Sequence, residues 1–144
     1  MITIYRRDFN LLIIHKKKLR NKIEKVFEIL QLSNQELSIV FESKNRMRFL
    51  KREYLGIDKT TDVLSFESRE TNPESGNTFL GDILISPGKA KQQAKEKHTS
   101  IDLEILTLCI HGILHLLGYD HASKSEAQIL FSLQDKILGE IYEK

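Results

Sequence analysis

One uncharged segment constrains the fold of this sequence more than any other feature. Residues 105–119 form a run of 15 without a single Asp, Glu, Lys or Arg. Within residues 101–117, apolar side chains point in nearly every direction around a helix, which is typical of a helix buried on all sides. Gly118 predicts the end of this helix. Because a bilayer span needs roughly 20 apolar residues, the run predicts a core helix and no membrane helix.

Other elements must cover this core helix, and hydrophobic periodicity predicts where they lie. Short alternating, β-branched or aromatic runs predict strands at residues 1–6, 36–42, 62–67 and 80–86. Helical spacing predicts helices at residues 12–32, 45–55 and 89–98, and a final helix that begins at a capping box of Ser123 and Glu126. The polar segment 68–78, with its proline and glycine, is typical of an exposed, mobile loop.

The order of these elements predicts the class of fold. It reads strand, helix, strand, helix, two strands and three helices, without a repeat or linker. We therefore expect an α+β fold, in which helices pack on one small mixed β-sheet within a single domain. The order of the strands in that sheet stays open. A chain of 144 residues buries roughly two-thirds of its surface on folding, so a core can form without a metal.

Charge and cysteine content bear on location and partners. The single Cys109 excludes an internal disulfide, and with no signal-peptide pattern at the N-terminus it favours the cytoplasm. Residues 1–25 hold eight Lys or Arg against two acids, and residues 44–59 hold six against two, although the net charge is only +2. These basic segments predict a footprint for phosphate backbones, and solvated helix faces remain the alternative interpretation.

Three of the five histidines fall within 11 residues, and their spacing predicts a metal site. His111 and His115 are four residues apart, so both rings project from one face of a helix. Gly118 allows the chain to turn back and bring His121 near them. Neutral imidazoles are good ligands for Zn²⁺, and three protein ligands leave a fourth position open, as in catalytic zinc sites. We expect one zinc ion, with the Asp120 carboxylate orienting a ligating ring from behind.

The steps of four and six residues between these histidines are also those of the metzincin proteases. Those enzymes place a glutamate directly after the first histidine as the general base, whereas this chain has Gly112 there. Glycine cannot transfer a proton. Peptide hydrolysis by that mechanism is therefore excluded.

Three segments carry a family resemblance: TDVLSF at residues 61–66, LGDI at residues 80–83 with the basic helix after it, and HGILHLLGYDH at residues 111–121. In this order they resemble the motifs of the YbeY family of bacterial endoribonucleases, and the resemblance extends from the first strand to the last helix. It implies one metal-dependent ribonuclease domain over residues 1–144, with zinc bound by His111, His115 and His121.

The resemblance also implies a biological role. It implies a cytoplasmic, single-strand-specific, zinc-dependent endoribonuclease that matures the 3′ end of 16S rRNA and takes part in ribosome quality control. The implied partners are single-stranded rRNA, the small ribosomal subunit, its protein uS11 and the GTPase Era.

The chain departs from the family pattern before the TDVLSF motif. The family usually has Asn and Arg at the positions of Lys51 and Leu55, and the arginine is implicated in activity. Because leucine cannot contact a phosphate, we expect Arg52 or Lys59 to supply the missing cation.

The catalytic base stays open. Asp82 and Asp62 lie in motif segments and are candidates, with turn and helix capping as the alternative role. We expect the N-terminal helix and the segment 46–59 to hold the RNA backbone, with the metal at the end of the groove between them. The candidate RNA-binding residues are Lys16, Lys17, Lys18, Arg46, Arg48, Lys51 and Arg52.

Two other functions stay open on sequence grounds. One is a ribosome-assembly or RNA-binding factor whose metal site is catalytically weak or inactive. The other is a metallohydrolase of a different substrate, which the missing glutamate and the basic segments disfavour.

Overall fold

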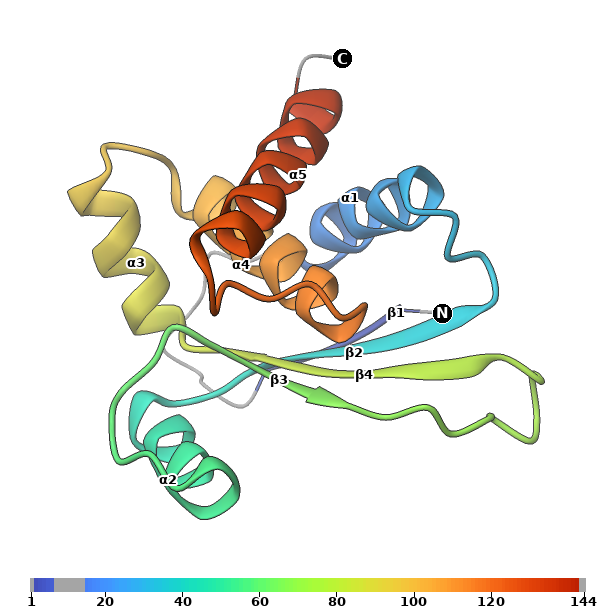
Figure 1. Cartoon of the computed structure of the whole chain (residues 1–144), viewed down its shortest axis with the longest axis horizontal. Coiled ribbons are helices and arrows are strands. Elements are labelled where there is room, and N and C mark those ends of the chain that lie inside the picture. The colour runs from blue at the N-terminus through green and yellow to red at the C-terminus, as the bar shows by residue number, and fades with distance from the viewer. Residues whose placement is uncertain (1, 7–14, 143–144) are drawn as a thin grey trace.

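A computed structural model of the chain describes residues 2–6 and 15–142 (Figure 1). Its strands are β1 (Ile2–Arg6), β2 (Gln35–Phe41), β3 (Val63–Glu67) and β4 (Thr78–Ile85). Its helices are α1 (Lys16–Ile29), α2 (Lys44–Leu55), α3 (Pro87–Glu96), α4 (Ile101–Leu116) and α5 (Lys124–Tyr142). The order of elements is the predicted one. The first residues of the helix predicted at 12–32 lie outside the described ranges.

The strands form one mixed sheet in the order β1-β2-β4-β3. β1, β2 and β4 run parallel, and β3 pairs antiparallel with β4 at one edge. Four helices, α1, α3, α4 and α5, lie over one face, and α2 lies on the other (Figure 1). The α+β class and the mixed sheet are therefore confirmed.

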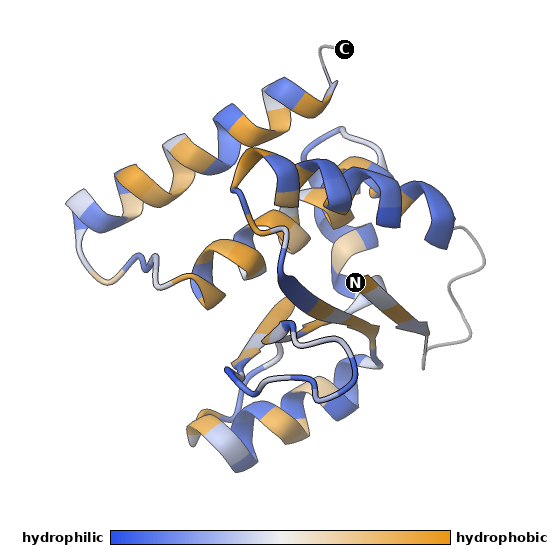
Figure 2. Cartoon of the chain, turned by 90° about the vertical axis from the view of Figure 1, so that its right-hand side faces the viewer, coloured by the Kyte–Doolittle hydropathy of each residue, from blue (hydrophilic) through white to orange (hydrophobic). Residues whose placement is uncertain are grey.

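The predicted core helix is α4, and it contacts β3, β4 and the other three helices on its face of the sheet. Ser100 caps its first turn by accepting from the Leu103 amide at 3.1 Å. Ten of its residues are buried, including Cys109. Hydrophobic residues gather where helices face the sheet, and the visible side of α1 is mostly hydrophilic (Figure 2). The all-round apolar pattern of α4 is thus explained by neighbours on every side.

The segment predicted as a mobile loop is exposed, but it is tied to β2. Glu36 accepts hydrogen bonds from Asn72 Nδ2 at 3.0 Å, Ser75 Oγ at 2.6 Å and Asn77 Nδ2 at 3.1 Å. These bonds, the Ser75 contact first, hold the pKa of the Glu36 carboxyl below its usual value. The polar residues that predict a loop here are therefore the same residues that anchor it to β2.

In the described ranges no single helix has the length and apolar composition of a membrane span; α3 and α4 meet these criteria only as a pair, and they are bent by 115°.

Candidate metal centre

Three imidazole rings converge at the C-terminal end of α4. His111 Nε2 lies 3.1 Å from His115 Nε2, one helical turn along. The ring centroid of His121 lies 5.1 Å from that of His115 and 5.8 Å from that of His111. One ring nitrogen of each histidine lies within 4.8 Å of those of the other two. The structure thus brings together the three residues predicted as ligands, in a cluster that could hold a metal ion.

The turn after α4 positions His121. Gly118 has a φ of 99°, in the left-handed region that favours glycine, and its amide donates to the His115 carbonyl at 3.0 Å. The Asp120 Oδ1 atom then accepts from the backbone amide of His121 at 2.7 Å. Asp120 therefore bonds to the backbone of the turn rather than to an imidazole, so its structural role is to shape the segment that presents His121.

Gln134 of α5 holds the ring of His111, a contact that the sequence analysis missed. Gln134 Oε1 lies 3.0 Å from His111 Nδ1, and Gln134 is only 7% exposed. An amide oxygen only accepts, so this contact places the proton on Nδ1 and leaves the Nε2 lone pair for a ligand. The available signal was a glutamine within the buried stripe of α5, which comprises Leu130, Gln134, Ile137 and Ile141.

The environment of His111 and His115 favours their neutral forms. Burial lowers the pKa of His111, and burial together with the neighbouring His111 lowers the pKa of His115. A neutral imidazole is the form that binds a metal. The donor set and its surroundings therefore fit a borderline cation such as Zn²⁺, for which imidazole nitrogen is a preferred ligand.

The cluster opens into a groove of about 400 Å³ between α2, β3 and α4. We call it the histidine groove. α2 contributes Lys51 and Leu55 to its wall, and the segment that leads into β3 contributes Thr61 and Asp62. Its other lining residues are Val63, Leu64, Ser65, Glu67, His111, His115, Leu116 and His121.

Comparison with known proteins identifies the protein family of this chain. A family model described as "Endoribonuclease YbeY" matches residues 5–142. The chain belongs to the YbeY family. It is 46% identical over 129 residues to "Endoribonuclease YbeY" of Persephonella marina, covering 89% of this chain and 84% of that protein. The protein of the same name from Sulfurihydrogenibium sp. shows the same identity and coverage.

The fold is also similar to a solved structure. The solution structure of TM1509 from Thermotoga maritima superposes with a TM-score of 0.66 at 28% sequence identity. The match covers 99% of this chain and 90% of that one. The similarity thus extends over the whole YbeY-like architecture.

The two positions that depart from the YbeY pattern both face the histidine groove. Lys51 and Leu55 line it, whereas Arg52 and Lys59, the residues expected to replace the missing arginine, are not among its lining residues. Arg52 Nε lies 3.6 Å from Glu53 Oε1, and its guanidinium lies 5.6 Å from the centroid of the Phe49 ring. Lys51 is therefore the α2 cation that the fold brings to the groove.

The two candidate carboxylates lie in different places. Asp62 lines the histidine groove, and its Oδ2 accepts from Gln93 Nε2 at 3.0 Å. Asp82 lines a separate groove on the α2 side of the sheet, with Arg46, Tyr54 and Phe66. Alternate residues of a strand face opposite sides, so Ile83 points toward α4 and Asp82 points away from it. The structure does not bring Asp82 to the histidines.

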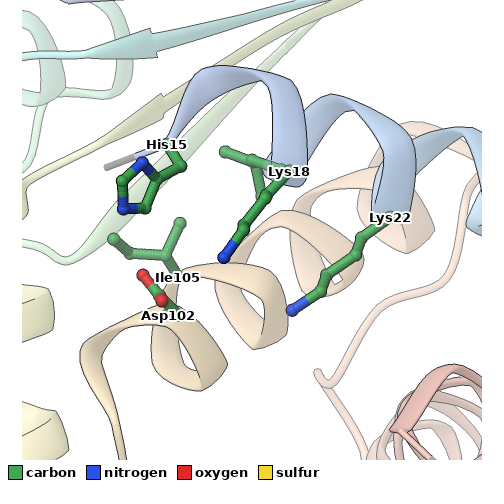
Figure 3. A pocket seen from close by; sticks show the side chains of 6 residues that line it. His15, Lys18, Lys22, Asp102 and Ile105 are labelled. Carbon is green, nitrogen blue, oxygen red and sulfur yellow. The ribbon is translucent and has the colours of Figure 1, made fainter. Parts of the chain in front are cut away.

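The other predicted RNA-binding residues are spread over the molecule. Arg48 Nε forms an ion pair with Asp58 Oδ1 at 2.7 Å. Lys18 lines a small pocket of about 30 Å³ at the first turn of α4, beside Asp102 and Ile105, and Lys16 and Lys17 belong to the same helix (Figure 3). Within the described residues, α1 and α2 lie on opposite faces of the sheet (Figure 1), so these two basic helices do not flank one groove.

The fold also explains the missing metzincin glutamate. A Cβ atom built on Gly112 would lie 2.9, 3.0 and 3.1 Å from three side-chain atoms of Ile83. Position 112 therefore faces β4 at close range. A glutamate side chain would collide with Ile83 there, so the position has no room for the metzincin base.

Proposed function

We propose that this YbeY-family chain is a zinc-dependent endoribonuclease that cleaves single-stranded RNA, with zinc held by His111, His115 and His121. The observation that carries the proposal is the convergence of three imidazoles in an open groove, in a chain whose relatives are named endoribonucleases. The proposed setting is the cytoplasm, where the chain matures the 3′ end of 16S rRNA and takes part in ribosome quality control. The proposed partners are the small ribosomal subunit, uS11 and Era.

Each residue in or beside the histidine groove has its own role in the proposed reaction. A zinc ion held by the three histidines would act as a Lewis acid toward a phosphodiester. Lys51 places a positive charge in the wall, where it attracts the RNA backbone. Asp62 lines the groove beside His111, and it is the carboxylate we assign to accept a proton from the attacking nucleophile. Gln134 keeps His111 in the tautomer that a ligand requires.

Leu55 supports a second candidate function. It lies in the groove wall and is 55% exposed, so an uncharged side chain occupies the position where the family pattern has an arginine. Loss of a cation that neutralises charge in a phosphoryl-transfer site costs rate. This observation favours a metal-containing ribosome-assembly factor that binds RNA and cleaves it slowly or not at all.

One assay decides between the two. A labelled single-stranded rRNA fragment is incubated with zinc-loaded protein, chelated protein, His115→Ala and, as matched control, His15→Ala, whose imidazole lies at the start of α1. Among these samples we expect cleavage only by the zinc-loaded protein and by His15→Ala. Zinc-loaded Leu55→Arg should cleave the fragment faster than the unaltered chain. RNA binding without cleavage by any of them would leave the assembly factor as the function.

A further inference from the structure

A second hollow adjoins the histidine groove. Its volume is about 450 Å³, and it lies between α3, α4 and α5. Asp62, Val63, His111 and His121 line both hollows. The histidine cluster therefore stands between two connected depressions, one toward α2 and one toward α5. We call the second one the α5 hollow.

The lining of the α5 hollow is unsuited to phosphate. Lys97 is the one Lys or Arg among its described lining residues, and its Nζ is engaged by the buried Glu104 at 3.1 Å. Asp62, Glu96 and Glu104 add three carboxylates. Away from the histidines a phosphate group would meet more carboxylates than cations, so this part of the lining favours an uncharged group that donates hydrogen bonds.

The α5 hollow also offers an exposed aromatic ring. Phe131 is 44% exposed, and it lies outside the buried stripe of α5. Its ring centroid lies 5.8 Å from that of His111, with an angle of 28° between the two planes. The ring therefore lies roughly parallel to the imidazole of His111, one of the proposed metal ligands. An exposed aromatic face beside hydrogen-bond acceptors is the chemistry that receives an unpaired nucleobase.

We propose that the α5 hollow is a nucleobase subsite, in which a base next to the scissile phosphate stacks on Phe131. The inference rests on the proposed function, because an RNA chain cut internally continues on both sides of the bond that breaks. The histidine groove receives one side of the strand along α2, and the α5 hollow receives the other. The Glu96 carboxylate in the lining accepts from the N–H donors of the base edge.

The test measures binding of a short labelled single-stranded RNA to chelated protein, so that no cleavage occurs. Phe131→Leu keeps apolar cover over His111 but removes the flat ring, whereas Phe131→Trp keeps a stacking surface. We expect Phe131→Leu to weaken binding by at least about fivefold, and Phe131→Trp to bind like the unaltered chain. The matched control is Ile129→Ala on the same helix, because Ile129 is 58% exposed and lies outside the hollow's lining.

Two further measurements separate stacking from an indirect effect. Against a sugar-phosphate chain of the same length without bases, Phe131→Leu and the unaltered chain should bind equally. Zinc affinity should be unchanged in Phe131→Leu; a parallel loss of zinc and RNA binding would overturn the subsite and make Phe131 a support for His111.

The inference and the proposed function fail in different ways. Normal RNA binding by Phe131→Leu, with weaker binding by Lys51→Ala, would overturn the subsite and leave the ribonuclease proposal standing. Absence of RNA binding by the unaltered chain would overturn both.

Discussion

Gln134 determines which nitrogen of His111 faces the histidine cluster. The ring of His111 has the buried side-chain amide oxygen of Gln134 behind it, whereas His115 hydrogen-bonds to the backbone of Tyr119. Partners of this kind fix the ring orientation and raise the basicity of a ligating histidine. The proposed site therefore depends on α5 as well as on the segment that carries its three histidines.

Replacing Gln134 should change zinc affinity. We expect Gln134→Leu to weaken zinc binding about 10- to 100-fold, measured by competition with a chromophoric chelator. Gln134→Glu retains an acceptor and should bind zinc at least as well as the unaltered chain. Gln128→Leu makes the same change at an exposed position of α5 and serves as the control. Equal zinc affinity in all four proteins would remove Gln134 from the site.

Local spacing explains what the sequence predicted of this site. His111, His115 and His121 lie within one helix and one turn, so helical geometry and Gly118 suffice to bring them together. Gln134 and Asp62 reach the site through tertiary packing, which spacing does not report. Asp82 shows the opposite failure: it belongs to a motif segment, but strand alternation turns it to the other face of the sheet.

At the scale of elements, the close approach of α4 to β4 sets the position of the whole site. Glycine at position 112 lets the helix backbone lie against Ile83. The α4 backbone contacts the Ile83 side chain directly there, so a larger residue must push helix and sheet apart or displace Ile83. His111 and His115 belong to the same helix and would move with it.

Gly112→Ala should therefore destabilise the fold even though alanine is the better helix former. Overpacking of this kind costs about 1 to 3 kcal/mol, measured by denaturant unfolding. Gly88→Ala in α3 is the matched control, because a Cβ there meets nothing within 4 Å and should be neutral or stabilising. Ile83→Val removes one of the three atoms in contact and should recover part of the loss. A neutral Gly112→Ala would show that Ile83 repacks freely.

At the scale of the whole molecule, the sequence predicted the elements but left their arrangement open. Periodicity identified every strand and helix because each has its own local pattern. The parallel pairing of β2 with β4 joins residues far apart in the chain, with β3 placed outside them, and no local pattern encodes this order. The expected groove between the two basic segments was wrong for the same reason. The sequence shows their composition, but it does not show that α1 and α2 lie on opposite faces of the sheet.

Zinc bound to the folded chain should stabilise the whole molecule. At 100 times its dissociation constant, a ligand specific to the folded state adds about 2.7 kcal/mol. For a domain near this size, that raises Tm by about 5 to 10 °C at constant pH. Calorimetry should show this rise, its reversal by a chelator and its absence in His115→Ala. The same rise in His115→Ala would place the stabilising ion elsewhere.

The order of the site residues along the chain has a consequence for folding. His111, His115 and His121 are synthesised before any part of α5 (Lys124–Tyr142), and Gln134 is added after all three. Until α5 docks, the His111 ring has no Gln134 oxygen behind it, and either of its nitrogens is available as a ligand. Docking of α5 therefore selects the nitrogen of His111 that faces the cluster, so the coordination of a bound metal would be fixed only as folding is completed.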